Sequence, residues 1–226
     1  MKTTVRPQAV LTAAAALTLT LTLAGPVLAA PRQDADDMAM GNPKAKVEVI
    51  EYASASCPHC AHFNEVVFPT LKSKWIDTGK VHYVMKEMLT PPEIVALAGF
   101  RIARCAGPDK YFKVVDEVFK SQPRWTNGNI KPILQQVAAD NGLDEAQFNA
   151  CLADEAAANA MAARAQRAAE QDGVTGTPTL FVNGAKLDPT PMTPDDLDAA
   201  ISAALKTPAP KAAAGLPPAK ARGGRK

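Results

Sequence analysis

The sequence is poor in aromatic side chains and in closely spaced metal-binding residues. Phe, Trp and Tyr make up 5% of the chain, whereas alanine is abundant, and this composition favours helices. The four cysteines are Cys57, Cys60, Cys105 and Cys151. No second C-x-x-C and no H-x-H completes the four ligands that structural zinc usually needs. We therefore expect no metal at Cys57 and Cys60; a site in which His59 joins the two sulfurs is the alternative.

The part of the chain that we expect to fold lacks a net positive charge. Six Lys or Arg and no acid lie in residues 206–226, and two more bases lie in residues 1–30. Without those eight bases, 17 bases remain against 23 acids, so the charge pattern does not indicate a nucleic-acid partner. Residues 206–226 are mostly Pro, Ala, Gly, Lys and Arg, which predicts a disordered basic tail. Such a tail either contacts an anionic lipid or wall polymer or stays solvated.

The amino terminus carries the pattern of a secretory signal peptide. Two bases precede an apolar run at residues 9–24, Gly25 and Pro26 break the run, and small residues follow as a cleavage site. The alternative is a membrane anchor, but the run is short for a spanning helix and contains four threonines. We predict that residues 1–30 are a signal peptide for export to the periplasm and that residues 31–45 form a flexible segment.

Export would place the cysteines in an oxidising compartment, where disulfides form and persist. Cys57 and Cys60 belong to a C-x-x-C motif, and its two sulfurs face each other if the segment begins a helix. Cys105 and Cys151 form the remaining pair. We expect a disulfide between Cys105 and Cys151; the alternative is that each is a small buried hydrophobic side chain.

Hydrophobic periodicity and turn residues predict an order of strands and helices around the C-x-x-C motif. Pro69 should kink the helix that follows the motif, Asn183-Gly184 predicts a hairpin turn, and Thr193 is a candidate N-cap. The expected strands are residues 46–52, 80–88, 179–182 and 185–187. The expected helices are residues 57–76, 93–105, 109–120, 130–141, 144–171 and 194–205. This order predicts an α/β fold in which a helical subdomain is inserted between two strands.

The motifs together resemble the DsbA family of thiol–disulfide oxidoreductases. The resemblance covers about residues 40–205 and is carried by the strand KVEVIEY, the CPHC motif at the start of a helix, the helical insertion, and Thr177-Pro178 before the hairpin. It implies a thioredoxin-like fold with an inserted all-helical subdomain. The thioredoxin-like domain would comprise residues 46–92 and 174–205, and the helical insertion residues 93–173.

The chemistry expected at the motif is thiol–disulfide exchange. The thiolate is the nucleophile, and Cys57 would lie at a helix N-terminus, where free N–H groups and the helix dipole favour negative charge. His59 would add a donor or partial positive charge nearby. A stabilised thiolate favours the reduced enzyme and makes the disulfide a stronger oxidant.

Two further site assignments come from the resemblance. It matches Glu51 to a buried acid that passes protons to and from Cys60; the alternative is a Glu on an exposed strand face, like Glu48. It also matches Thr177-Pro178 to a cis-proline loop that faces the C-x-x-C motif and pairs its backbone with substrate. Strong oxidases of the family commonly have Val before this proline, whereas Thr also occurs in isomerases and reductases, so the direction of electron flow stays open.

The resemblance implies an enzyme without a cofactor that oxidises reduced or unfolded exported proteins. A quinone-linked membrane protein would reoxidise it. The alternatives are a reductase or isomerase of the same fold, and a redox-inactive module that binds metal or acts as a chaperone.

Overall fold

A mixed five-stranded sheet lies at the centre of the protein. The computed structural model describes residues 30–125 and 128–207. Within them the strand order is β1-β3-β2-β4-β5, with β2 and β3 parallel and the other pairs antiparallel. The strands are β1 (Met38–Gly41), β2 (Val47–Ala53), β3 (Val81–Glu87), β4 (Thr179–Val182) and β5 (Ala185–Lys186). The predicted signal peptide and basic tail lie outside the described residues, apart from Ala30 and residues 206–207.

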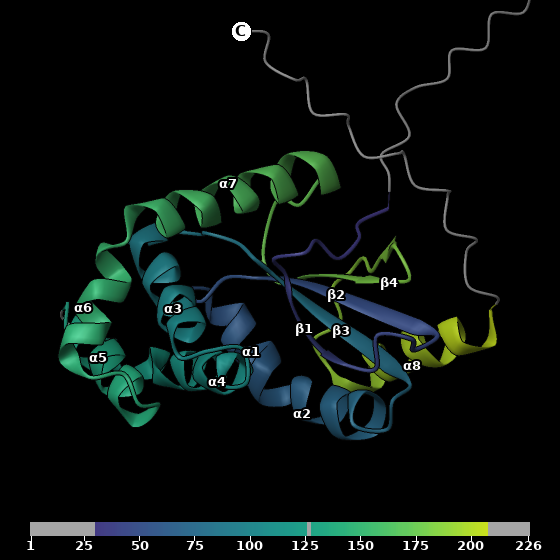
Figure 1. Cartoon of the computed structure of the whole chain (residues 1–226). Coiled ribbons are helices and arrows are strands. Elements are labelled where there is room, and N and C mark those ends of the chain that lie inside the picture. The colour runs from purple at the N-terminus through teal and green to yellow at the C-terminus, as the bar shows by residue number, and fades with distance from the viewer. Residues whose placement is uncertain (1–29, 126–127, 208–226) are drawn as a thin grey trace, which may run out of the picture.

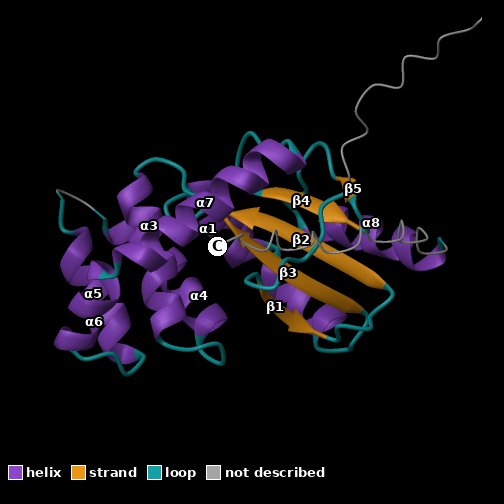
Figure 2. Ribbon diagram, turned by 45° about the horizontal axis from the view of Figure 1, so that its top comes forward, coloured by secondary structure: helices purple, strands orange, loops and turns teal. Residues whose placement is uncertain are grey.

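Helices cover both faces of the sheet and extend beyond one of its ends. Helix α7 crosses one face, α1, α2 and α8 lie against the other, and α3 to α6 gather at one end (Figures 1 and 2). The helices are α1 (Pro58–Val66), α2 (Phe68–Thr70), a π-helical turn (Leu71–Ile76), α3 (Glu93–Cys105), α4 (Tyr111–Ser121), a 3₁₀ turn (Gln122–Arg124), α5 (Ile130–Asp140), α6 (Glu145–Ala153), α7 (Glu155–Asp172) and α8 (Pro194–Lys206). The predicted α/β fold, with a helical insertion between two strands of the sheet, is confirmed.

Both faces of the central strand β2 are buried, as parallel strands between two helical layers usually are. Val49 and Ala53 point into the larger core, which α1 contributes to through Cys60 and Phe63. The alternate position Ile50 points to the opposite face, where alanines of α7 pack. Successive side chains of β2 therefore pack into two different cores. The odd-numbered residues of β2 lie on the face that packs against α1, the helix that begins at the C-x-x-C motif.

The prediction of a flexible segment at residues 31–45 is wrong for the part that forms β1. Met38 to Gly41 pair with β3 in antiparallel register, from Met38 opposite Met85 to Gly41 opposite His82. Met38 also packs against the core from a partly buried position. The run is short and irregular in sequence, and its backbone becomes ordered because the edge of β3 offers it hydrogen-bond partners.

The single long helix expected at residues 144–171 is also wrong. The structure contains α6 and α7, separated at Asp154, whose backbone is extended. The Asp154 side chain accepts a hydrogen bond from the N–H of Ala157 at 3.0 Å and so caps α7. Capping at Asp154 therefore prevails over the helix propensity of the alanine-rich sequence around it.

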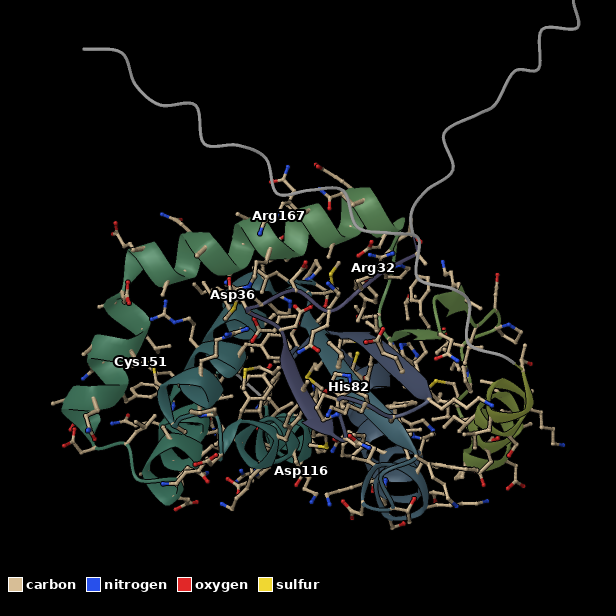
Figure 3. All side chains as sticks on the ribbon, turned by 45° about the vertical axis from the view of Figure 1, so that its right-hand side comes forward. Arg32, Asp36, His82, Asp116, Cys151 and Arg167 are labelled. Atoms are coloured by element: carbon tan, nitrogen blue, oxygen red, sulfur yellow. A yellow bond between two sulfur atoms is a disulfide. The ribbon has the colours of Figure 1, made fainter. Side chains whose placement is uncertain are left out.

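A buried carboxylate at the end of β3 joins the sheet to the helical insertion. Glu87 is 5% exposed, and its carboxylate accepts two hydrogen bonds from Arg104 of α3, at 2.7 and 2.9 Å. Arg164 of α7 donates a third at 3.2 Å, and the Tyr111 hydroxyl of α4 a fourth at 2.9 Å. Arg104 also donates to the backbone oxygen of Asp36, which lies beneath α7 in Figure 3. One side chain thus connects three helices of the insertion to the sheet.

This network predicts that Glu87→Gln destabilises the fold severely. Two arginines would lose the negative charge that compensates them in a poorly solvated site, which costs about 3 kcal/mol when a buried ion pair loses one partner. Urea denaturation measures the change in free energy of unfolding. Asp77→Asn is the matched control, because the Lys72–Asp77 pair is half exposed on both sides and should contribute less than about 1 kcal/mol. Equal, small losses in both variants would contradict the prediction.

Candidate active site

Cys57 stands at the start of α1, where the loop after β2 turns into the helix. It is the N-cap residue, with extended backbone angles of φ −82° and ψ 120°, and Pro58 occupies the first helical turn. Proline suits that turn because the first helical N–H groups have no partner within the helix. The remaining N–H groups are free to point at the Cys57 sulfur.

The surroundings of Cys57 lower the pKa of its thiol to about 5. The largest cause is a hydrogen bond from the side chain of Cys60, with further ones from the Thr177 hydroxyl and from the backbone N–H groups of Cys60 and His59. Burial opposes these effects and raises the pKa. When the thiol is protonated it donates instead to the Thr177 carbonyl at 3.2 Å. In this structure the buried Thr177 hydroxyl has no hydrogen-bond partner among the described residues, so it is free to turn to the thiolate.

His59 contributes differently from the sequence-based expectation. Its side chain is exposed, and its backbone N–H is the group that lowers the pKa of Cys57. We find no hydrogen bond of the His59 imidazole among the described residues.

The second sulfur lies in the opposite environment. Cys60 is completely buried, and burial together with the neighbouring Cys57 and Glu51 raises the pKa of its thiol well above the usual range. The N–H of Ser54 lies 3.5 Å from its sulfur. The two cysteines, both free thiols in this structure, are therefore strongly unequal: Cys57 ionises easily and Cys60 does not.

Glu51 lies on the face of β2 that packs against α1. The residue is 2% exposed, and burial raises the pKa of its carboxyl to about 7. Ionised Cys57 raises this pKa further, whereas a hydrogen bond from the Tyr83 hydroxyl at 2.6 Å lowers it. Glu48, three residues earlier on the other face, keeps one third of its side chain exposed. The alternative of an exposed Glu51 is thus excluded.

The loop before β4 faces the two cysteines. The peptide bond between Thr177 and Pro178 is cis, and the Thr177 carbonyl is in contact with Cys57 as described above. The loop before β4, which is distant in sequence, therefore meets the end of β2 and the start of α1 at one point.

Several polar residues that hold the active-site loop were not identified from the sequence. Ser56 donates to the Thr90 carbonyl at 2.8 Å, and the Thr90 N–H donates to the Ser54 hydroxyl at 3.2 Å. Gln122, from the helical insertion, donates to the carbonyls of Ala55 and Cys57 at 2.9 and 3.3 Å. The small residues before Cys57 were the only sequence signal, because the partners come from remote segments.

A groove of about 420 Å³ begins beside the C-x-x-C motif. Its lining residues are Pro58, Ala61, His62, Glu65, Phe119, Lys120, Gln122 and Pro123. It therefore runs between α1 and the insertion. Trp125, which follows the 3₁₀ turn, donates its indole N–H to the Ser121 hydroxyl at 2.9 Å.

The other two cysteines lie away from this site. A disulfide joins Cys105 at the end of α3 to Cys151 of α6, with the Cα atoms 6.3 Å apart. Figure 3 shows Cys151 at the outer side of the insertion, far from His82 of the sheet. The bond links two helices of the insertion that are 46 residues apart in sequence.

Residues 30–125 and 128–207 contain neither a cluster of metal ligands nor a membrane-spanning helix. No cluster of three or more His, Cys, Asp or Glu in these ranges could hold a metal ion. No helix within the same ranges is long and apolar enough to cross a membrane.

Comparison with known proteins agrees with this geometry. The model of a family described as thioredoxin matches residues 33–203. The chain belongs to this thioredoxin family. The crystal structure of alpha-DsbA1 from Wolbachia pipientis superposes on this thioredoxin-fold chain with a TM-score of 0.70 and 28% identity, covering 76% of it and 92% of that protein. The DsbA resemblance is thereby confirmed.

Two further relatives are informative. A protein-disulfide isomerase from Novosphingobium aromaticivorans superposes with a TM-score of 0.64 and 26% identity, covering 76% of this DsbA-like chain and 98% of that protein. A Rickettsia bellii protein named as a protein-disulfide oxidoreductase is 32% identical over 157 residues. The match covers 69% of this chain but 60% of the Rickettsia protein, so the chain spans somewhat over half the length of that relative.

The low pKa of Cys57 predicts a thiolate at neutral pH. In the reduced protein, the thiolate absorbance at 240 nm should rise with a midpoint near pH 5. Cys60→Ala should move that midpoint upward, since it removes the largest stabilising contact. Because the folded pKa lies below the ordinary value of 9.0, the thiolate stabilises the reduced fold at alkaline pH, and this stabilisation is lost as the pH falls through about 5. A midpoint near 9 would contradict the assignment of Cys57.

Proposed function

We propose that this protein is an exported thiol–disulfide oxidoreductase that oxidises cysteine pairs in periplasmic or secreted proteins. The observation that carries the proposal is the difference between the two sulfurs. Burial raises the pKa of the Cys60 thiol, whereas hydrogen-bond donors surround Cys57 and lower the pKa of its thiol to about 5. A pair in which one thiolate is so strongly favoured is stable in its reduced form. Its disulfide is accordingly a good oxidant.

The first step is the attack of a client thiolate on Cys57 in the oxidised enzyme. A bond forms between the client sulfur and the Cys57 sulfur, and the Cys57–Cys60 bond breaks with its electron pair on Cys60. Cys60 is buried and holds a negative charge poorly, so it takes a proton. Protonated Glu51 is the proposed donor, because the pKa of its carboxyl is about 7 and both acid and base forms exist at neutral pH.

The second step releases the product. A second client thiolate attacks the client sulfur of the mixed disulfide, and Cys57 leaves as the thiolate that its surroundings stabilise. The client gains a disulfide, the enzyme keeps one thiolate and one thiol, and Glu51 regains a proton from solvent. The Thr177-Pro178 loop is the proposed site of backbone pairing with the client, since it contacts the reacting sulfur.

The proposed partners follow from this chemistry and from the sequence. Clients are reduced or unfolded exported chains, and the groove beside Pro58 offers them room next to the reacting sulfur. A quinone-linked membrane protein is the proposed reoxidant, and no cofactor of the protein itself takes part. Export rests on the signal-peptide pattern of residues 1–30.

The reduction potential of the Cys57–Cys60 pair tests the direction of electron flow. Equilibration in defined glutathione buffers should give a value well above that of thioredoxin, which is about −270 mV. A value close to thioredoxin's would instead identify a reductase or isomerase of the same fold. Cys57→Ser is the companion variant: it should abolish oxidation of a reduced client peptide, whereas binding by the fold alone would survive it.

The proposed role of Glu51 predicts a specific kinetic defect. Glu51→Gln should slow the reaction of a client dithiol with the oxidised enzyme at neutral pH by about tenfold or more, because Cys60 would leave without a proton donor. Stopped-flow fluorescence over a range of pH measures the rate. Glu48→Gln is the control: Glu48 lies on the opposite face of the same strand with one third of its side chain exposed, and the variant should react at the original rate. Unchanged kinetics in Glu51→Gln would remove Glu51 from the mechanism.

A further inference from the structure

Tyr83 is a fully buried residue of β3 that takes no part in the exchange steps above. Its exposed fraction is 0%, and its ring packs edge to face against Phe68, with ring centres 5.2 Å apart, and tilted against Phe112 at 5.9 Å. Packing against these rings therefore fixes the orientation of the Tyr83 ring. Its hydroxyl lies at the end of this rigid ring and donates to Oε2 of Glu51 at 2.6 Å.

The contacts of Glu51 make this hydrogen bond unusual. A buried carboxylate is costly unless a cation or several hydrogen bonds compensate it. Among the described residues Glu51 forms no ion pair, and the Tyr83 hydroxyl is the one side-chain donor that we find on its carboxyl. Besides Tyr83, the ionisable groups that face it are Cys57 and Cys60. Ionised Cys57 raises the pKa of Glu51, and the Glu51 carboxylate raises the pKa of Cys60, so neither cysteine compensates the negative charge of Glu51.

We propose that Tyr83 is a positioning residue that holds the Glu51 carboxyl in place beneath Cys60 and stabilises its ionised form. This inference rests on the proposed function, because it assigns Tyr83 a part in the proton transfer that Glu51 performs there. Tyr83 itself keeps its proton throughout: burial and the nearby Glu51 raise its pKa well above the usual range, and Tyr111 of α4 adds to that shift.

The Tyr83 hydroxyl affects the proton transfer in both directions. When Glu51 protonates Cys60, a carboxylate remains in an apolar site, and the Tyr83 hydroxyl is the group that stabilises it. In the reverse step, Glu51 must be ionised to take the proton from Cys60 before Cys60 attacks a mixed disulfide on Cys57. Without the hydroxyl, the pKa of Glu51 should rise above about 7, so that the carboxylate forms only at more alkaline pH.

Tyr83→Phe tests the inference, because it removes the hydroxyl and keeps the packed ring. Carboxyl carbon shifts of ¹³C-labelled Glu in the full protein should show the Glu51 pKa rising by about one unit, a tenfold change. A second readout is the release of glutathione by Cys60 from a mixed disulfide formed on Cys57. The rate of this release should rise with pH, and the midpoint of the profile should move to higher pH by the same amount as the Glu51 pKa.

Tyr111→Phe is the matched control. Tyr111 is equally buried, and its hydroxyl donates to the other buried carboxylate of the sheet, Glu87, at 2.9 Å. Its loss should destabilise the fold but leave both the Glu51 titration and the glutathione-release profile in place. A displaced profile in both variants would attribute the effect to a general loss of a buried hydroxyl and overturn the proposal.

The combination with Glu51→Gln completes the test. In that background Tyr83→Phe should no longer move the glutathione-release profile, since no carboxyl remains to be held. A displacement of the original size would mean that Tyr83 acts on the cysteines directly, and an unchanged Glu51 titration in the single variant would also overturn the inference. The titration needs no client, so a reduction potential near thioredoxin's would count against the proposed oxidase and leave this result standing.

Discussion

The hydrogen bonds that converge on the Cys57 sulfur are the interaction on which the rest of the site depends. They come from the start of α1, from Cys60 and from Thr177, and they turn an ordinary thiol into a group with a pKa of about 5. The loop contacts of Gln122 and Thr90 matter because they hold that sulfur where the donors meet. The helical insertion thus reaches the chemistry through the backbone of the active-site loop rather than through a side chain that reacts.

Two buried glutamates on neighbouring strands have different roles because their surroundings differ: Glu87 is structural, whereas Glu51 is suited to proton transfer. Glu87 and Glu51 each accept a hydrogen bond from a buried tyrosine. Arg104 and Arg164 compensate the charge of Glu87, which suits a permanent link between sheet and insertion. Glu51 has no such compensation among the described residues, and burial raises its pKa to about 7. The uncompensated carboxyl can therefore exchange a proton at neutral pH, which a transfer group must do.

Much of the fold could be predicted because its signals are local. The β-branched run of β2, the proline after Cys57 and the Asn183-Gly184 turn each specify the structure of their own segment, and each prediction agrees with the structure within a few residues. The predictions were wrong where a partner remote in sequence, or a helix cap, determined the local structure. β1 forms because β3 offers an unpaired edge, and α6 ends before α7 because Asp154 caps the second helix.

The sequence by itself determined the α/β order, the reactive pair and its place at a helix start, because these depend on spacing and on residue type. Only the tertiary structure decided that Glu51 is buried against Tyr83, that Thr177 contacts Cys57, and that Gln122 holds the active-site loop. Gly99 illustrates the reason: a Cβ there would lie 2.8 Å from the Cβ of Ala55, a closeness that nothing near it in sequence indicates. Burial and hydrogen bonds set each pKa at the site, and both come from segments that only folding brings together.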